Sequence, residues 1–186
     1  MPSTWLIDAC CLLNILASGY CEAILRSPRN GQVQDYTVAE IACNEVLYLR
    51  RGGNGEDADT HETVDLEPLF ASGLLRLERL ETVEETEAFV ALATQLDDGE
   101  AATCALALQR DYGIVTDDRK ARHLLASGTP AIDCVGTLEL LKAWSDAAGS
   151  DPISVAVALR SIRDRARYIP PRSDPLRLWW DAMINS

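Results

Sequence analysis

The chain has 186 residues, 47% of them apolar and 25% charged, which is enough for one well-buried core with an appendage. No apolar stretch approaches the roughly 18 residues that a membrane-spanning helix needs, and no secretion signal opens the chain, so we expect a cytoplasmic protein without membrane contact. The formal net charge of −12 argues against non-specific adhesion to nucleic acid, because like charges repel at long range. A nucleic-acid substrate would need local cationic contacts.

The cysteines predict neither a zinc site nor a disulfide framework. No two of them are spaced as Cys-x-x-Cys, and all lie inside or beside apolar runs. We therefore expect buried, reduced thiols.

In the first half of the chain, an apolar run over residues 4–7 predicts a strand that ends at Asp8. Helical spacing follows over 9–16 and 21–26, and 35–38 is typical of a second strand. Apolar positions three and four residues apart predict a helix over 39–50, which the sequence RGGNGED ends. Residues 51–65 contain almost no apolar side chains that could be buried, so we predict an exposed loop there.

In the second half, the alternating sequence LLRLERL (74–80) predicts a strand near a sheet edge. Helices are expected over 84–96, 99–110, 119–126 and 137–144, separated by buried strands over 113–116 and 131–135. Five strands that alternate with helices predict an α/β fold: a three-layer α/β/α sandwich around a central five-stranded parallel sheet.

Residues 147–186 are predicted to form a helical C-terminal extension to a main domain spanning 1–146. The sequence SDP, at 150–152 and again at 173–175, is a helix-start signature. Arginines concentrate between these two starts. The adjacent Trp179 and Trp180 are more typical of packing or of a contact with a second subunit than of base stacking.

Three acidic residues stand where strand-like and helix-like runs meet: Asp8, Glu100 and Asp118. In an alternating α/β layout such junctions lie at the carboxyl edge of the sheet, so the carboxylates should converge there. They would repel one another unless a divalent cation neutralised them, and ligands that are all oxygen favour Mg²⁺ or Mn²⁺. Glu45 could reach the same place from its own helix, although Glu40 competes for this role. The pair at 97–98 is expected to cap a helix.

Four blocks in this order resemble the PIN-domain family of metal-dependent ribonucleases, of the VapC-like or PilT N-terminal type. The blocks are the strand with Asp8 and CLLNIL, then EIACNEVLYLR, LDDGEAATCALALQRDYG and IVTDDRKAR, and the resemblance covers residues 4–144. It implies that the catalytic and metal-binding carboxylates are those of Asp8, Glu45, Glu100 and Asp118, with Asp117 as a further metal ligand. It also implies that Thr116 orders the cluster. Cys10 departs from the family pattern, because Ser or Asn is usual two residues after the first acid.

The same resemblance implies an endoribonuclease that uses Mg²⁺ or Mn²⁺ to hydrolyse RNA phosphodiester bonds, and the toxin role of a type II toxin-antitoxin module. Its partners would be RNA, an antitoxin protein and a second copy of the chain. Arg119, Lys120 and Arg122 follow the last acids directly, and we expect them to contact the RNA backbone.

Two alternatives belong to other functional classes. One is a PIN-like scaffold with an idle site. The other is a Mg²⁺-dependent phospho-aspartate protein, either a receiver domain or a phosphatase. The phosphatase pattern needs Asp-x-Asp after the first strand, where this chain has Cys10. The receiver pattern needs paired acids there, whereas the pair in this chain follows the sequence IVT.

Overall fold

The computed structural model describes residues 2–46, 48–51, 60–128, 131–147 and 151–185. These residues belong to two compact units, each assembled from separate chain segments. The first unit comprises Met1–Leu12, Gln34–Val46 and Asp65–Gly136, and the second comprises Leu13–Val33, Leu47–Val64 and Thr137–Ser186. No helix in the described ranges is long and apolar enough to cross a membrane.

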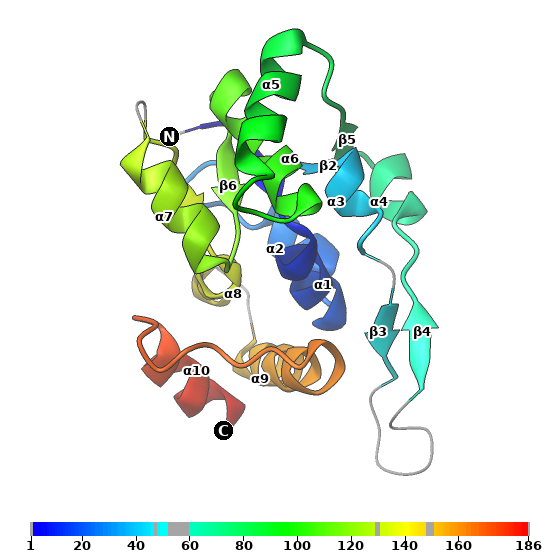
Figure 1. Ribbon diagram of the computed structural model, residues 1–186. Coiled ribbons are helices and arrows are strands. Elements are labelled where there is room, and N and C mark those ends of the chain that lie inside the picture. Colours follow the sequence, from blue (N-terminus) through cyan, green and yellow to red (C-terminus); the bar gives the residue numbers. More distant parts are fainter. Residues whose placement is uncertain (1, 47, 52–59, 129–130, 148–150, 186) are drawn as a thin grey trace. The chain divides into compact units, whose positions relative to one another are not determined.

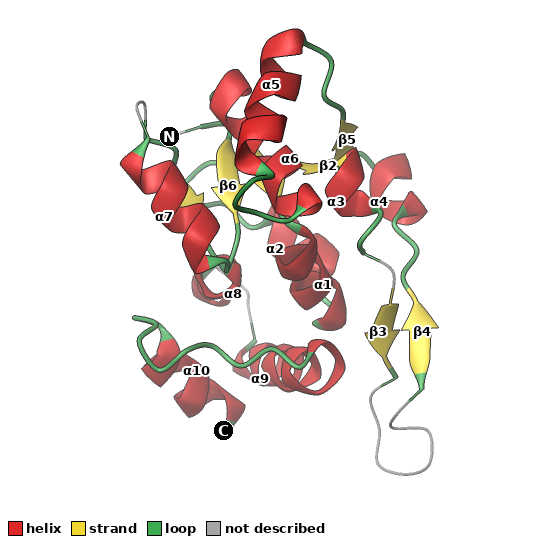
Figure 2. Ribbon diagram, viewed as in Figure 1, coloured by secondary structure: helices red, strands yellow, loops and turns green. Residues whose placement is uncertain are grey.

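A five-stranded parallel sheet forms the centre of the first unit (Figures 1 and 2). Its strands are β1 (Thr4–Ile7), β2 (Asp35–Ala39), β5 (Arg76–Glu78), β6 (Gly113–Val115) and β7 (Cys134–Val135). Their order is β5-β2-β1-β6-β7, and every neighbouring pair is parallel. The connections therefore lead to one side of β1 first and to the other side afterwards, which makes β1 the point where the strand order reverses.

The central strand is buried along its whole length, as expected for a parallel sheet covered on both faces. Its neighbour β6 comes so close that the ring of Trp5 lies against Gly113. A Cβ atom at Gly113 would be 2.6 Å from that ring, so only glycine fits this position without a shift of the ring. This contact explains why the buried strand begins with a glycine.

Helices flank the sheet and complete the first unit. They are α3 (Glu40–Cys43), α4 (Glu67–Ala71), α5 (Val83–Leu92), α6 (Asp98–Arg110) and α7 (Arg119–Ser127), together with the start of α1 (Ala9–Ala17). Helix α6 packs against β1, β2 and β6 and also contacts α3, α5 and α7. Small buried residues such as Ala101 and Ala105 allow this close approach. The α/β sandwich predicted from the sequence is confirmed.

The second unit contains mostly helices. Its elements are the end of α1, α2 (Cys21–Arg26), β3 (Tyr48–Arg50), β4 (His61–Thr63), α8 (Thr137–Asp146), α9 (Pro152–Ser161), the short π-helix η2 (Ile162–Ala166) and α10 (Arg177–Ile184). Strands β3 and β4 pair antiparallel. The guanidinium of Arg165 in η2 contacts the Glu62 carboxylate of β4 and donates a 2.9 Å hydrogen bond to the carbonyl of Ala17. The arginine thereby ties three segments of this unit together.

Two of the sequence predictions are wrong in part. The helix expected over 39–50 ends at Cys43, and residues 48–50 form β3 instead. The loop expected over 51–65 contains β4, and its residues 52–59 lie outside the described chain. Strand β3 exists because β4 pairs with it, a partner distant in sequence that local periodicity does not show.

Candidate metal and nuclease site

The predicted acids approach one another at the carboxyl edge of the sheet, beside the reversal of strand order. Asp8 follows the central strand β1 directly, and Asp118 follows β6 after two residues. Helix α6 begins at the same edge with Asp97 as its N-cap and Glu100 in its first turn. In open α/β sheets this crevice is where ligands bind.

Asp8 is the most enclosed of these acids, with only 4% of its surface exposed. One carboxylate oxygen accepts the Ala9 N–H at 2.8 Å, and the other accepts from the Thr116 hydroxyl at 3.2 Å and from the Cys10 thiol at 2.9 Å. Burial raises the pKa of Asp8, while these hydrogen bonds oppose the rise. The neighbours therefore hold the carboxylate in a fixed orientation but do not neutralise it.

Glu100 carries the largest pKa shift among the predicted acids, to about 7. Burial is the first cause, and the charges of neighbouring carboxylates add to it. Those carboxylates belong to Asp118, Asp97 and Asp8. These carboxylates therefore act on one another electrostatically at this edge of the sheet, and their role as one metal site stays a prediction.

Glu45 reaches this cluster from the segment after α3, although its side chain is exposed. Its carboxylate lies against Gly99 in the first turn of α6, where an added Cβ atom would be 2.5 Å from Oε1. The Gly99 N–H donates a hydrogen bond to this carboxylate. Partial desolvation of the carboxylate, followed by the charges of Asp97 and Asp8, raises the pKa of Glu45.

The competing acid, Glu40, lies in a different environment. Its carboxylate forms an exposed ion pair with Arg79, 2.8 Å from Nη2 and 2.9 Å from Nε. Of the two glutamates that the sequence left open, Glu45 is the one beside the first turn of α6.

Asp118 has two structural roles at the end of β6. Its carboxylate caps α7 by accepting the Ala121 N–H at 2.7 Å, and its own N–H donates to the Thr116 hydroxyl at 3.1 Å. Thr116 thus bridges the backbone of Asp118 to the carboxylate of Asp8 and orders both. Burial raises the pKa of the Cys11 thiol, and the charge of the neighbouring Asp117 adds to this rise.

Two participants were not assigned to the cluster from the sequence. Asp97 has its predicted capping role, accepting the Glu100 N–H at 2.9 Å, but its charge also acts on Asp8, Glu45 and Glu100. Gly99 provides the space for Glu45. The only signal for either was the run LDDGE at the helix start, which a cap alone would explain.

The three basic residues after the cluster lie in the first turns of α7. Lys120 donates from its ammonium group to the Gln95 carbonyl, a contact that links α7 to the segment before α6. Arg119 is exposed and Arg122 is half-buried. They stand next to the acidic cluster in sequence and on a helix that Asp118 caps.

The carboxylate oxygens of these acids suit a hard divalent cation as ligands. Burial and mutual repulsion disfavour their negative charges, and a bound cation would offset this cost. Within the described ranges, none of the four predicted catalytic acids forms an ion pair with a basic side chain. Within the same ranges, no three or more Asp, Glu, His or Cys side chains already stand in coordination geometry. The residues therefore fit a metal ion chemically, and ligand side chains would have to adjust to bind one.

Comparison with known proteins adds one finding. The model of a PIN-domain family matches residues 54–173, more than half of the chain, and the match includes Glu100 and Asp118. A search of curated proteins finds no relative of this sequence. The strand order, the acids at the carboxyl edge and the family match agree, and the chain belongs to the PIN-domain family.

Proposed function

We propose that this protein is a metal-dependent endoribonuclease whose catalytic carboxylates are those of Asp8, Glu45, Glu100 and Asp118. The observation that supports this most directly is that they converge at the reversal point of the sheet without a basic partner among the described side chains. PIN domains are generally nucleases and typically bind divalent metals, so the family gives independent support.

The chain's own residues would position the reacting groups. Asp8, held by the Ala9 N–H and the Thr116 hydroxyl, presents a carboxylate of fixed orientation. Asp118 and Glu100 offer further oxygens to Mg²⁺ or Mn²⁺, and we keep Asp117 as a candidate ligand. Such an ion, when bound, supplies Lewis acidity toward water and the phosphodiester.

The cations of α7 would hold the RNA backbone. Arg119 and Arg122 lie one and four residues after Asp118, so a phosphate at the cluster is within their range. Lys120 is the third candidate, and its ammonium group also binds the Gln95 carbonyl.

We further infer a toxin role in a toxin-antitoxin module, with an antitoxin and a second copy of the chain as partners. The inference comes from the resemblance to VapC-like toxins and stays a proposal. The tail arginines remain a candidate site for an acidic antitoxin segment, although Arg165 and Arg177 already pair with Glu62 and Asp181. Arg167 and Arg172 form no ion pair within the described chain and are the better candidates.

Cleavage of a labelled single-stranded RNA with and without Mn²⁺ tests the nuclease proposal. We expect cleavage that a chelator abolishes and that Asp8→Asn lowers by at least about 100-fold, because the substitution removes one charged ligand. The Asp35→Asn variant is the matched control. Asp35 begins β2 at the opposite edge of the sheet, and its exposed carboxylate pairs with Arg76. This variant should cleave RNA as fast as the unaltered protein.

Equal activity of the Asp8→Asn and Asp35→Asn variants would contradict the proposal, as would cleavage that persists after chelation. Folded protein that never cleaves RNA with either metal would favour an idle scaffold. The toxin role is tested separately, by growth arrest on expression that Asp118→Asn relieves. Arrest of equal strength by the Asp118→Asn variant would contradict it.

A further inference from the structure

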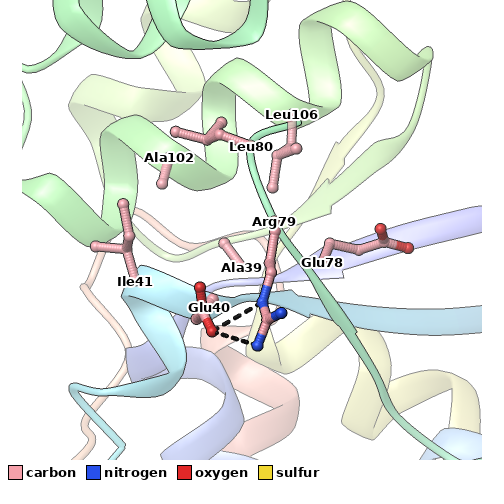
Figure 3. Close-up of a pocket in the computed structure, with 8 residues that line it drawn as sticks. All are labelled: Ala39, Glu40, Ile41, Glu78, Arg79, Leu80, Ala102 and Leu106. Atoms are coloured by element: carbon pink, nitrogen blue, oxygen red, sulfur yellow. Dashed lines mark hydrogen bonds and ion pairs between the residues drawn. The ribbon is translucent and has the colours of Figure 1, made fainter. Parts of the chain in front are cut away.

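A small pocket opens in the first unit where β2 and β5 end, at Ala39 and Glu78 (Figure 3). Its volume is about 180 Å³, well below the roughly 300 Å³ at which pockets for drug-sized ligands begin. Its walls are apolar and come from β2, α3, α6 and the segment after β5: Ala39, Ile41, Leu80, Ala102 and Leu106. The size and the walls suit one flat ring system and not a whole nucleotide.

The rim of the pocket carries one ion pair. Arg79 binds Oε1 of Glu40 through both Nε and Nη2, at 2.9 and 2.8 Å, and Figure 3 shows the two side chains directed at each other. No hydrogen bond to the second carboxylate oxygen of Glu40 occurs within the described chain. The third polar residue, Glu78, points away from this pair in Figure 3 and binds Arg110 at 2.6 Å. Acceptor oxygens and guanidinium donors therefore lie side by side at the pocket mouth.

The pocket and the acidic cluster share the same pair of helices. Helix α3 packs against α6, and the segment that leaves α3 places Glu45 against Gly99. Ala102 and Leu106 follow Gly99 on α6 by three and seven residues, which is about 4.5 and 10 Å along the helix axis. A stacked strand rises roughly 3.4 Å per nucleotide, so this separation along α6 equals the rise of one to three nucleotides.

We propose that this pocket binds a guanine base of the RNA close to the scissile phosphate, an inference that rests on the nuclease function proposed above. Guanine is the base with two neighbouring N–H donors, N1–H and the N2 amino group, next to a carbonyl acceptor. The Glu40 carboxylate accepts from the two donors, and the Arg79 guanidinium donates to the adjacent O6. The ring lies against the apolar walls, as bases do in pockets that read their Watson–Crick edge.

Binding of free nucleosides tests the pocket without any metal or turnover. Isotope-labelled protein is titrated with guanosine and, separately, with cytidine, and amide shifts are followed by NMR. We expect guanosine to shift the amides of Ala39, Ala102 and Leu106 and to bind at least about fivefold more tightly than cytidine. Glu40→Gln should remove that preference, because an amide offers one acceptor where the carboxylate offers two.

Asp35→Asn is again the matched control, since it also turns an exposed, arginine-paired carboxylate into an amide. It should leave guanosine binding unchanged. Equal affinity for both nucleosides, shifts confined to other parts of the chain, or equal effects of the two variants would overturn the assignment.

Cleavage of RNAs that carry inosine in place of guanosine separates this inference from the nuclease proposal. Inosine lacks only the 2-amino group, so the unaltered protein should cleave it at least about fivefold more slowly, and Glu40→Gln should cleave both RNAs equally. If RNA is cleaved without any preference for guanosine over inosine, the pocket assignment is wrong and the nuclease function stands. If no RNA is cleaved while guanosine binds as expected, the nuclease function is wrong and guanine recognition by the pocket stands on its own.

Discussion

Gly99 shows how closely the site depends on a single residue. Its backbone has an ordinary helical conformation, so backbone strain does not explain the glycine. The carboxylate of Glu45 does, because it occupies the volume that a Cβ atom would fill. The residue therefore couples the start of α6 to the position of one acid.

We expect Gly99→Ala to lower kcat/KM for RNA by at least about tenfold while leaving thermal stability equal or slightly higher, since alanine is the better helix former. The loss would arise because Glu45 must move away. A double-mutant cycle checks this. In a Glu45→Ala background, Gly99→Ala should lower kcat/KM no further. Additive losses would show that it acts through another group.

The individual acids were predictable to different degrees. Asp8, Glu100 and Asp118 each stand at a strand end or a helix start, and the structure brings them together there. The sequence favours Glu45 with Glu40 as its competitor, but it does not show the partner that sets Glu40 apart, Arg79, which lies 39 residues after Glu40. The catalytic and metal-binding roles stay predictions.

At the scale of elements, α5 and α6 are joined by a partly buried ion-pair network. Arg110, at the end of α6, binds Glu85 of α5 and Glu78 of β5, each at 2.6 Å. Glu85 also completes the capping box of α5 with Thr82. Hydrogen bonding to Arg110 is the first cause that lowers the pKa of Glu85, to about 2.

Glu85→Gln should therefore reduce the free energy of unfolding by about 2 kcal/mol at pH 7, after allowing for solvent screening. Because the folded-state pKa is depressed, the contribution is complete above the unfolded pKa of about 4.5 and disappears as the pH falls toward 2. Urea unfolding at pH 7 and at pH 4 measures this contribution. The difference in the free energy of unfolding between the Glu85→Gln variant and the unaltered protein should be smaller at pH 4. Glu84→Gln, an exposed neighbour on α5, is the control, and a pH-independent difference would contradict the argument.

Element prediction succeeded where local signals decide the structure and failed where a distant partner does. Asp151 and Pro152 predicted the start of α9, which the Asp151 carboxylate caps. The segment after Cys43 keeps the apolar spacing of a helix, yet Tyr48 is a good strand former, and Tyr48 and Leu49 pair with β4. A helix prediction from spacing alone could not include that partner.

At the scale of the whole molecule, the net charge of −12 opposes RNA binding, so the proposed affinity for RNA would have to come from local contacts. Arg122→Ala should weaken binding of any single-stranded RNA and lower the slope of log affinity against log salt by about 0.7. Arg26→Ala is the matched control, because it removes the same charge from an exposed pair on α2. Equal effects of the two variants on RNA binding would assign the attraction to total charge and not to α7.

The five strands of the sheet were predictable from the sequence, because four are short, largely apolar runs beside helix-like segments and β5 lies in an alternating run. The division into domains was harder. The family match runs to residue 173, past residue 146 where the sequence suggests that the main domain ends, and the two compact units each combine distant segments. The boundary at 146 stays a prediction.

Asp97 has a consequence for how the molecule can be engineered. The Asp97 carboxylate caps the N-terminus of α6, and its charge also acts on Glu100 in the acidic cluster. Asparagine caps helices about as well as aspartate does, so exchanging the two at this position would alter electrostatics while the fold keeps its anchor. We therefore expect Asp97→Asn to change the affinity of the proposed metal site for cations while the architecture stays the same.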